Sequence, residues 1–161
     1  MAGGPVAPIS AFPATTGRVF ESVHTGGGGN SPNEIGMGVE ASVGADSTWQ
    51  LRFKMPESLP SGTAKLQLWA LANATTGSAK VNPKWRSVAV EEDPTDTSLN
   101  AEGTSTLTWS TGDDDQYKEL LITLDADTVV AGEMIVMDLV FETTSWTLAA
   151  ISTWHAFIIW G

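Results

Sequence analysis

The stretch MIVMDLVFET, Met134–Thr143, decides the fold because its side chains alternate between two faces along its whole length. One face is wholly apolar and consists of Ile135, Met137, Leu139 and Phe141. The other face includes the two acids Asp138 and Glu142. A period of two is typical of a β-strand, and a single apolar face favours a half-buried strand packed on a second sheet. We therefore expect a central strand of a β-sandwich.

Shorter alternating runs separated by turn residues fill the chain from residue 35 onward. The expected strands besides Met134–Thr143 are 35–43, 47–55, 64–72, 84–90, 104–110, 117–124 and 153–160. We interpret 73–83 as a loop and 91–103 as a long polar connection, because turn-forming and polar residues dominate both. Strands of this length and spacing predict an all-β fold, an eight-stranded antiparallel β-sandwich over residues 35–161. If the topology is a jelly roll, our first choice, Met134–Thr143 pairs antiparallel with 47–55.

The first 34 residues differ from the rest in composition. They hold four of the eight prolines and the glycine run Gly26–Gly29, with few apolar residues. This composition predicts a Gly/Pro-rich extended N-terminal arm and not a domain with its own core. Because ordering such a segment costs roughly 1–2 kcal/mol per residue, we expect other surfaces, such as neighbouring copies of the chain, to cover it.

Size, cysteine content and charge limit the function. The chain has 161 residues and no cysteine, so one packed domain without disulfides is expected. We expect no signal peptide and no membrane span, because no basic segment leads into an apolar core and no run of 18 apolar residues occurs. The formal net charge of -11 repels phosphates and anionic lipids, which argues against nucleic acid and membrane as partners.

The charges are unevenly distributed along the chain. Residues 47–90 contain six bases and one acid, whereas residues 91–127 contain eleven acids and one base. Solvated acidic loops are the ordinary interpretation of this pattern. The competing hypothesis is that the basic region of one copy contacts the acidic region of another copy or of a partner.

No catalytic or metal site is predicted. His24 lies in the glycine-rich arm and His155 on a strand face, and neither belongs to a nucleophile elbow or an HExxH zinc motif. We expect a protein that is not an enzyme and needs no cofactor. Calcium is the competing interpretation of the acidic loops, but the run Asp113–Asp115 lacks the spacing of an EF-hand.

The seven tryptophans fall into two groups. Four lie on apolar strand faces and are expected in the core: Trp49, Trp109, Trp154 and Trp160. Three are candidates for an interface or a glycan contact: Trp69, Trp85 and Trp146. Trp69 shares its face with Lys65 and Gln67, and Trp146 lies in the turn TTSWT. An exposed indole stacks on a sugar or anchors a subunit interface.

The stretches LPSGTAKLQLWALANATTGSAKVNPKW (59–85) and TLTWSTGDDDQYKELLITLDADTVVAGEMIVMDLVFETTSWTLAAISTWHAFIIW (106–160) carry a resemblance to known proteins. They are similar to small β-sandwich proteins encoded in tailed-bacteriophage genomes, whose likeness to capsid cement, decoration and tail-appendage proteins implies a structural role. The resemblance covers about the last two-thirds of the chain, contains no catalytic motif and transfers no functional residue.

Two functions follow as hypotheses. The first is a non-enzymatic virion protein, a capsid cement or decoration protein assembled in the host cytoplasm. It would stabilise the phage head as a homo-oligomer, expected as a trimer, on the major capsid protein or other virion proteins. The alternative is a carbohydrate-binding or host-recognition module on a tail or head fibre, with a surface glycan as its partner.

Overall fold

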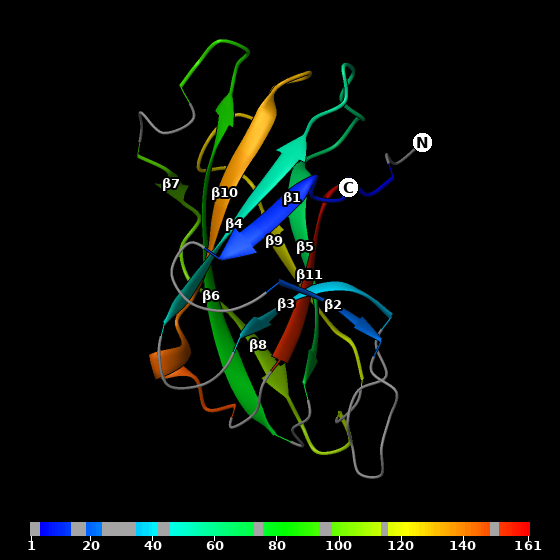
Figure 1. Ribbon diagram of the computed structural model, residues 1–161, viewed down its shortest axis with the longest axis vertical. Coiled ribbons are helices and arrows are strands. Elements are labelled where there is room, and N and C mark those ends of the chain that lie inside the picture. Colours follow the sequence, from blue (N-terminus) through cyan, green and yellow to red (C-terminus); the bar gives the residue numbers. More distant parts are fainter. Residues whose placement is uncertain are drawn as a thin grey trace.

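The computed structural model describes residues 4–13, 19–23, 35–41, 46–72, 76–93, 98–113, 116–148 and 152–161. Within them the chain forms two antiparallel β-sheets packed face to face (Figure 1). The strands are β1 (Ser10–Pro13), β2 (Val19–Val23), β3 (Ile35–Ala41), β4 (Ser47–Lys54), β5 (Ala64–Ala72), β6 (Gly77–Val88), β7 (Asn100–Ala101), β8 (Ser105–Trp109), β9 (Lys118–Thr123), β10 (Met134–Phe141) and β11 (Ser152–Trp160). The helical structure in these residues is the 3-10 turn η1 (Thr143–Ser145), so none of them forms a helix that could cross a membrane.

The strand order is that of a jelly roll. One sheet runs β1-β4-β10-β6-β7, with β8 also paired to β6, and the other runs β2-β3-β11-β5-β9. All eight predicted strands are present, as β3, β4, β5, β6, β8, β9, β10 and β11. Numbered one to eight along the chain, they form sheets of order 1-8-3-6 and 2-7-4-5. Every connection between consecutive strands crosses to the opposite sheet except that from strand 4 to strand 5, which pair with each other. The predicted all-β jelly roll is confirmed.

The predicted pairing of the deciding stretch is confirmed as well. Strand β10 lies antiparallel between β4 and β6, with Met137 opposite both Leu51 and Trp85. Its predicted apolar face is buried, since Ile135, Met137, Leu139 and Phe141 are each 0% exposed. The core also contains all four tryptophans predicted there, and the Phe141 ring lies 5.1 Å from that of Trp154. Side chains of both sheets therefore interlock in one core.

Strand β6 is longer than predicted. The segment Gly77–Pro83, interpreted from composition as loop, pairs with β10 and with β8, while residues 73–75 lie outside the described residues. Pro83 fits here because its carbonyl accepts from Glu102 N on the side facing β7 and β8. A strand residue directs its N–H and C=O to the same side, so the nitrogen of Pro83 lies between the β8 and β7 pairings. Because proline has no N–H, the reciprocal hydrogen bond from Pro83 to Glu102 is not made, and this gap falls where β6 passes from its β8 pairing to its β7 pairing.

The described part of the predicted arm is hydrogen-bonded to the same chain. Val6 exchanges two backbone hydrogen bonds with Ile158 of β11, at 2.8 and 3.1 Å. Strand β1 pairs with β4, so residues 6–13 connect the two sheets, and β2 pairs with β3. These pairings cover strand edges that would otherwise present unpaired backbone groups. The division at residue 34 and an ordering of the arm by neighbouring copies stay predictions.

Candidate functional site

An aromatic patch lies on the outer face of the five-stranded sheet. We define it as Trp69 of β5, Tyr117 just before β9, and His155 and Phe157 of β11. Alternation along β5 creates it, because Leu66, Leu68 and Ala70 point into the core at 0% exposure and the residues between them point outward. Trp69 is 42% exposed and Tyr117 is 48% exposed, which is unusual for large aromatic side chains.

The strand register brings these residues into adjacent rows. Trp69 lies opposite His155 on one side and opposite Glu119 on the other. Gln67 lies opposite Phe157 and Leu121 in the next row. Leu121 is 47% exposed and extends the apolar surface. Three strands that are distant in sequence therefore contribute to one continuous surface.

The rings of the patch are tilted against one another. The Trp69 centroid lies 6.0 Å from that of Tyr117 at 49° and 6.1 Å from that of Phe157 at 68°. The Tyr117 and His155 centroids are 6.0 Å apart at 60°. Such tilted and edge-on contacts are favourable between aromatic rings and hold each ring in place. The surface is consequently an angled corner of rings and not a flat platform.

A hollow of about 220 Å³ opens beside Trp69, and its other lining residues are Tyr117, Lys118 and Glu119. Hydrogen bonds and an ion pair within the chain hold the polar groups at its edge in place. The Glu119 carboxylate accepts a 2.5 Å hydrogen bond from the Gln67 amide, and the Lys118 ammonium lies 2.8 Å from Asp113 Oδ2. An aromatic wall with a few fixed polar groups at the rim is typical of a small-molecule site.

Asp113 holds the turn that leads into this site. Its carboxylate accepts hydrogen bonds from Lys118 Nζ and, at 2.7 Å, from Ser110 N. The hydrogen bond from Lys118 and then that from Ser110 lower the pKa of Asp113 below its ordinary value of 3.8. The ionised side chain therefore stabilises the turn between β8 and β9, and with it the position of Tyr117.

Of the three candidate contact tryptophans, the structure exposes Trp69 and buries the other two. Trp85 is 0% exposed, and its indole N–H donates to Glu102 at 2.5 Å. Trp146 is 8% exposed and donates to the carbonyl of Lys80 at 2.9 Å. The sequence interpretation left both open because it could not show these polar partners inside the fold. In the isolated chain Trp85 and Trp146 are core residues.

Sequence reasoning missed Tyr117, Phe157 and the role of Glu119. Each lies on an outward face of a predicted strand, so alternation alone would have marked the face. What alternation does not reveal is that β9 and β11 flank β5. Among the described residues no three His, Asp, Glu or Cys side chains form a metal-binding group. His24, Asp114 and Asp115 lie outside the described residues.

Comparisons with known proteins show the fold. No protein-family model and no curated protein matches the sequence. The CBM22-2 xylan-binding domain from Paenibacillus barcinonensis Xyn10C matches with a TM-score of 0.53 at 11% identity, over 98% of each chain. The arabinose-bound α-L-arabinofuranosidase MgGH51 matches with a TM-score of 0.51 at 9% identity, over 98% of this chain and 24% of the enzyme. The family 11 carbohydrate-binding module from Clostridium thermocellum matches with a TM-score of 0.46 at 9% identity, over 94% and 88%.

Proposed function

We propose that this chain is a carbohydrate-binding module and that its ligand binds the aromatic patch. The observation that supports this proposal most directly is the exposed ring of Trp69, which Tyr117 and Phe157 hold at the edge of a hollow. One face of a sugar ring presents mainly C–H groups. Stacking that face on an indole buries apolar surface on both partners.

The polar residues around Trp69 can form hydrogen bonds with the hydroxyl groups of a sugar. Hydroxyl groups need donors and acceptors, and the patch offers the carboxylate of Glu119, the amide of Gln67 and the ammonium of Lys118. The Gln67–Glu119 hydrogen bond and the Lys118–Asp113 ion pair fix these groups before a ligand arrives. Binding then costs less side-chain ordering entropy than binding by free side chains.

The size and shape of the site favour recognition of one ring at a time. A hollow of about 220 Å³ is smaller than the roughly 300–1,000 Å³ of pockets that hold drug-sized ligands. The tilts of 49° and 68° do not provide the coplanar rings that a flat crystalline polysaccharide would require. A soluble or branched glycan chain that presents single sugar units is the better match.

The fold likeness supports this proposal more than the virion hypothesis. The xylan-binding domain of Xyn10C shares the fold over nearly the whole of both chains. The role proposed here needs no chemical step, in keeping with the expectation that the chain is not an enzyme. The capsid cement role, the trimer and the virion location draw no support from these likenesses and stay predictions.

A glycan array followed by isothermal titration calorimetry tests the proposal. We expect the chain to bind at least one class of neutral plant or microbial glycan. Trp69→Ala should weaken that binding by about tenfold or more, which corresponds to roughly 1.4 kcal/mol, because the stacking surface is lost. Trp69→Phe should retain most of the affinity, because it keeps an aromatic face.

The matched control is Val130→Ala, an exposed apolar residue at 37% that does not line the hollow. It should bind as the unchanged chain does. Absence of binding to every glycan on the array, or equal affinity of the Trp69→Ala variant, would contradict the proposal.

A further inference from the structure

A second hollow, of about 300 Å³, lies on the opposite face of the molecule, on the outer side of the six-stranded sheet. Its floor is apolar and consists of Val88, Met134 and Val136. Val136 is 2% exposed although it points away from the core, and it lies in register between Arg52 and Arg86. An apolar floor on the outer face of a sheet is an unusual feature, since such faces are ordinarily solvated.

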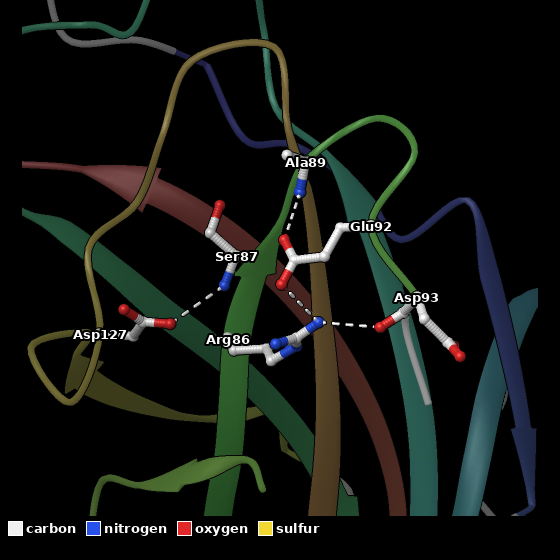
Figure 2. A network of polar contacts seen from close by, with 6 residues as sticks. All are labelled: Arg86, Ser87, Ala89, Glu92, Asp93 and Asp127. Carbon is white, nitrogen blue, oxygen red and sulfur yellow. Dashed lines mark hydrogen bonds and ion pairs between the residues drawn. The ribbon is translucent and has the colours of Figure 1, made fainter. Parts of the chain in front are cut away.

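One wall of this hollow is built by the turn after β6, and a buried arginine anchors it. Arg86 is 7% exposed, and its Nη2 lies 3.0 Å from both the carbonyl of Asp93 and the Glu92 carboxylate (Figure 2). The other carboxylate oxygen of Glu92 accepts from Ala89 N at 3.1 Å, which closes the turn. Figure 2 also shows Asp127 bonded to Ser87 N on the far side of β6. The wall is therefore fixed within the chain.

The opposite rim carries two cations, Arg52 and Lys54 of β4. Arg52 Nη2 donates to the side-chain oxygen of Gln50 at 3.2 Å, and Lys54 Nζ donates to the carbonyl of Gly132. Lys54 also forms an ion pair of 3.4 Å with Glu57, whose side chain is 86% exposed. Exposed pairs of this kind contribute little and exchange readily for another anion. The acid that lines the hollow, Glu92, is already paired with Arg86. The hollow thus presents positive charge above an apolar floor, in a protein whose formal net charge is -11.

We propose that this second hollow binds a uronic acid unit of an acidic polysaccharide. The carboxylate of the sugar would accept hydrogen bonds from Arg52 and Lys54, and its C–H face would lie on the accessible apolar side chains of the hollow, Met134 and Val90. Charge-assisted hydrogen bonds to a carboxylate are stronger than neutral ones, and an arginine can donate two at once. The inference rests on the proposed function in that the ligand is a saccharide, but it uses other residues on another face.

An acidic loop of a second copy is the rival occupant, and the structure favours the sugar. Two described acids of the loops are paired within their own chain, Asp113 with Lys118 and Glu92 with Arg86. A hollow with an apolar floor also fits a compact ring better than an extended carboxylate side chain.

Calorimetry with tetragalacturonic acid and its fully methyl-esterified form tests this site. The ester keeps the ring faces and removes the charge. We expect the unchanged chain to bind the acid, with an affinity that falls as salt is added, and to bind the ester at least about tenfold more weakly. Lys54→Gln should weaken binding of the acid severalfold, and the Arg52→Gln, Lys54→Gln double variant about tenfold or more, with thermal melting confirming that both variants fold.

Two control variants show whether binding of the acid depends on this hollow. Lys84→Gln removes a cation from the same sheet outside the hollow and should leave the affinity for the acid unchanged. Trp69→Ala should also leave it unchanged, even if it abolishes binding of a neutral glycan. A failure of the aromatic patch to bind any neutral glycan would therefore not affect this result.

Four results would overturn the inference. The first is equal affinity of the unchanged chain for the ester and the acid, and the second is an undiminished affinity for the acid in the folded Lys54→Gln and double variants. The other two are loss of acid binding in Trp69→Ala, and a loss of affinity for the acid in Lys84→Gln as large as that in Lys54→Gln. Light scattering tests the rival occupant, an acidic loop of a second copy of the chain. If the unchanged chain is an oligomer that the double variant dissociates, a second copy and not a sugar fills the hollow.

Discussion

The carboxylate of Glu102 holds three segments of the chain together. Its Oε1 accepts from the indole of Trp85 at 2.5 Å, from Asp125 N at 2.8 Å and from Ala126 N at 3.0 Å. Trp85 is fully buried, so its N–H has no access to solvent if this partner is removed. The hydrogen bonds connect β6, the connection before β8 and the turn after β9.

Glu102→Ala should therefore destabilise the fold by about 2–3 kcal/mol, because a buried donor and two backbone donors lose their acceptor. Glu102→Gln should cost less, since its amide oxygen can still accept. Urea denaturation followed by fluorescence measures both changes. The control is Glu57→Ala, at an 86% exposed side chain, which should change stability by less than about 0.5 kcal/mol. An equally small change for Glu102→Ala would show that this network does not stabilise the fold.

Asp113 should make part of the stability depend on pH. Its pKa is lowered in the folded state by Lys118 and then by Ser110 N, so the ionised carboxylate stabilises the fold above its ordinary pKa of 3.8. That contribution is lost as the pH falls below 3.8 and through the lower folded pKa. Urea denaturation of the chain and of Asp113→Asn should show a stability difference at about pH 7 that shrinks toward about pH 2. A difference that stays constant over this range would be the contrary result.

Single side chains were only partly predictable from the sequence. Trp69 was placed on a polar face because Lys65 and Gln67 share its alternation, and the structure exposes it. Trp85 and Trp146 were left as candidates because their buried polar partners, Glu102 and the carbonyl of Lys80, are distant in sequence. Alternation predicts the direction of a side chain, but not what covers it.

The first residue of β6, Gly77, occupies a position in which a side chain would not fit. Gly77 has φ +134°, and a Cβ atom would lie 2.7 Å from the Cα of Leu148. Gly77→Ala should therefore cost about 2–4 kcal/mol, from backbone strain and from displacement of the segment after η1. The control is Gly103→Ala, where φ is +88° but nothing lies within 4 Å of the added atom. Thermal denaturation should show the larger loss of stability for Gly77→Ala. Equal losses in the two variants would show that the close approach of Leu148 adds nothing to the cost of backbone strain.

The strands were predicted well wherever alternation was long. Met134–Thr143 and Ser47–Met55 were identified with nearly their observed bounds, because each packs one apolar face on the core. The short strands β1, β2 and β7 were not expected, since 4, 5 and 2 residues are too few to show a clear alternation. The start of β6 was missed because glycine, asparagine and proline there suggested a turn.

The complete molecule presents two different outer faces. The five-stranded sheet carries exposed aromatic rings, and the six-stranded sheet carries cations above an apolar floor. The basic 47–90 region and the acidic 91–127 region meet within one chain in the pair Arg86–Glu92. This pairing accounts for part of the charge pattern without a second subunit. The jelly-roll order was predictable, whereas the residues that each face brings together depended on which strands become neighbours.

Nuclear magnetic resonance of the indole N–H groups tests the central proposal most directly, because six of the seven tryptophans are at most 8% exposed and Trp69 is 42% exposed. The Trp69 signal is assigned by its absence in Trp69→Phe, and the chain is titrated with the glycan that binds best on the array. We predict that the Trp69 signal shifts in proportion to occupancy while the signals of Trp49, Trp85 and Trp109 stay in place. A saturating glycan that leaves the Trp69 signal unmoved would contradict binding at the aromatic patch.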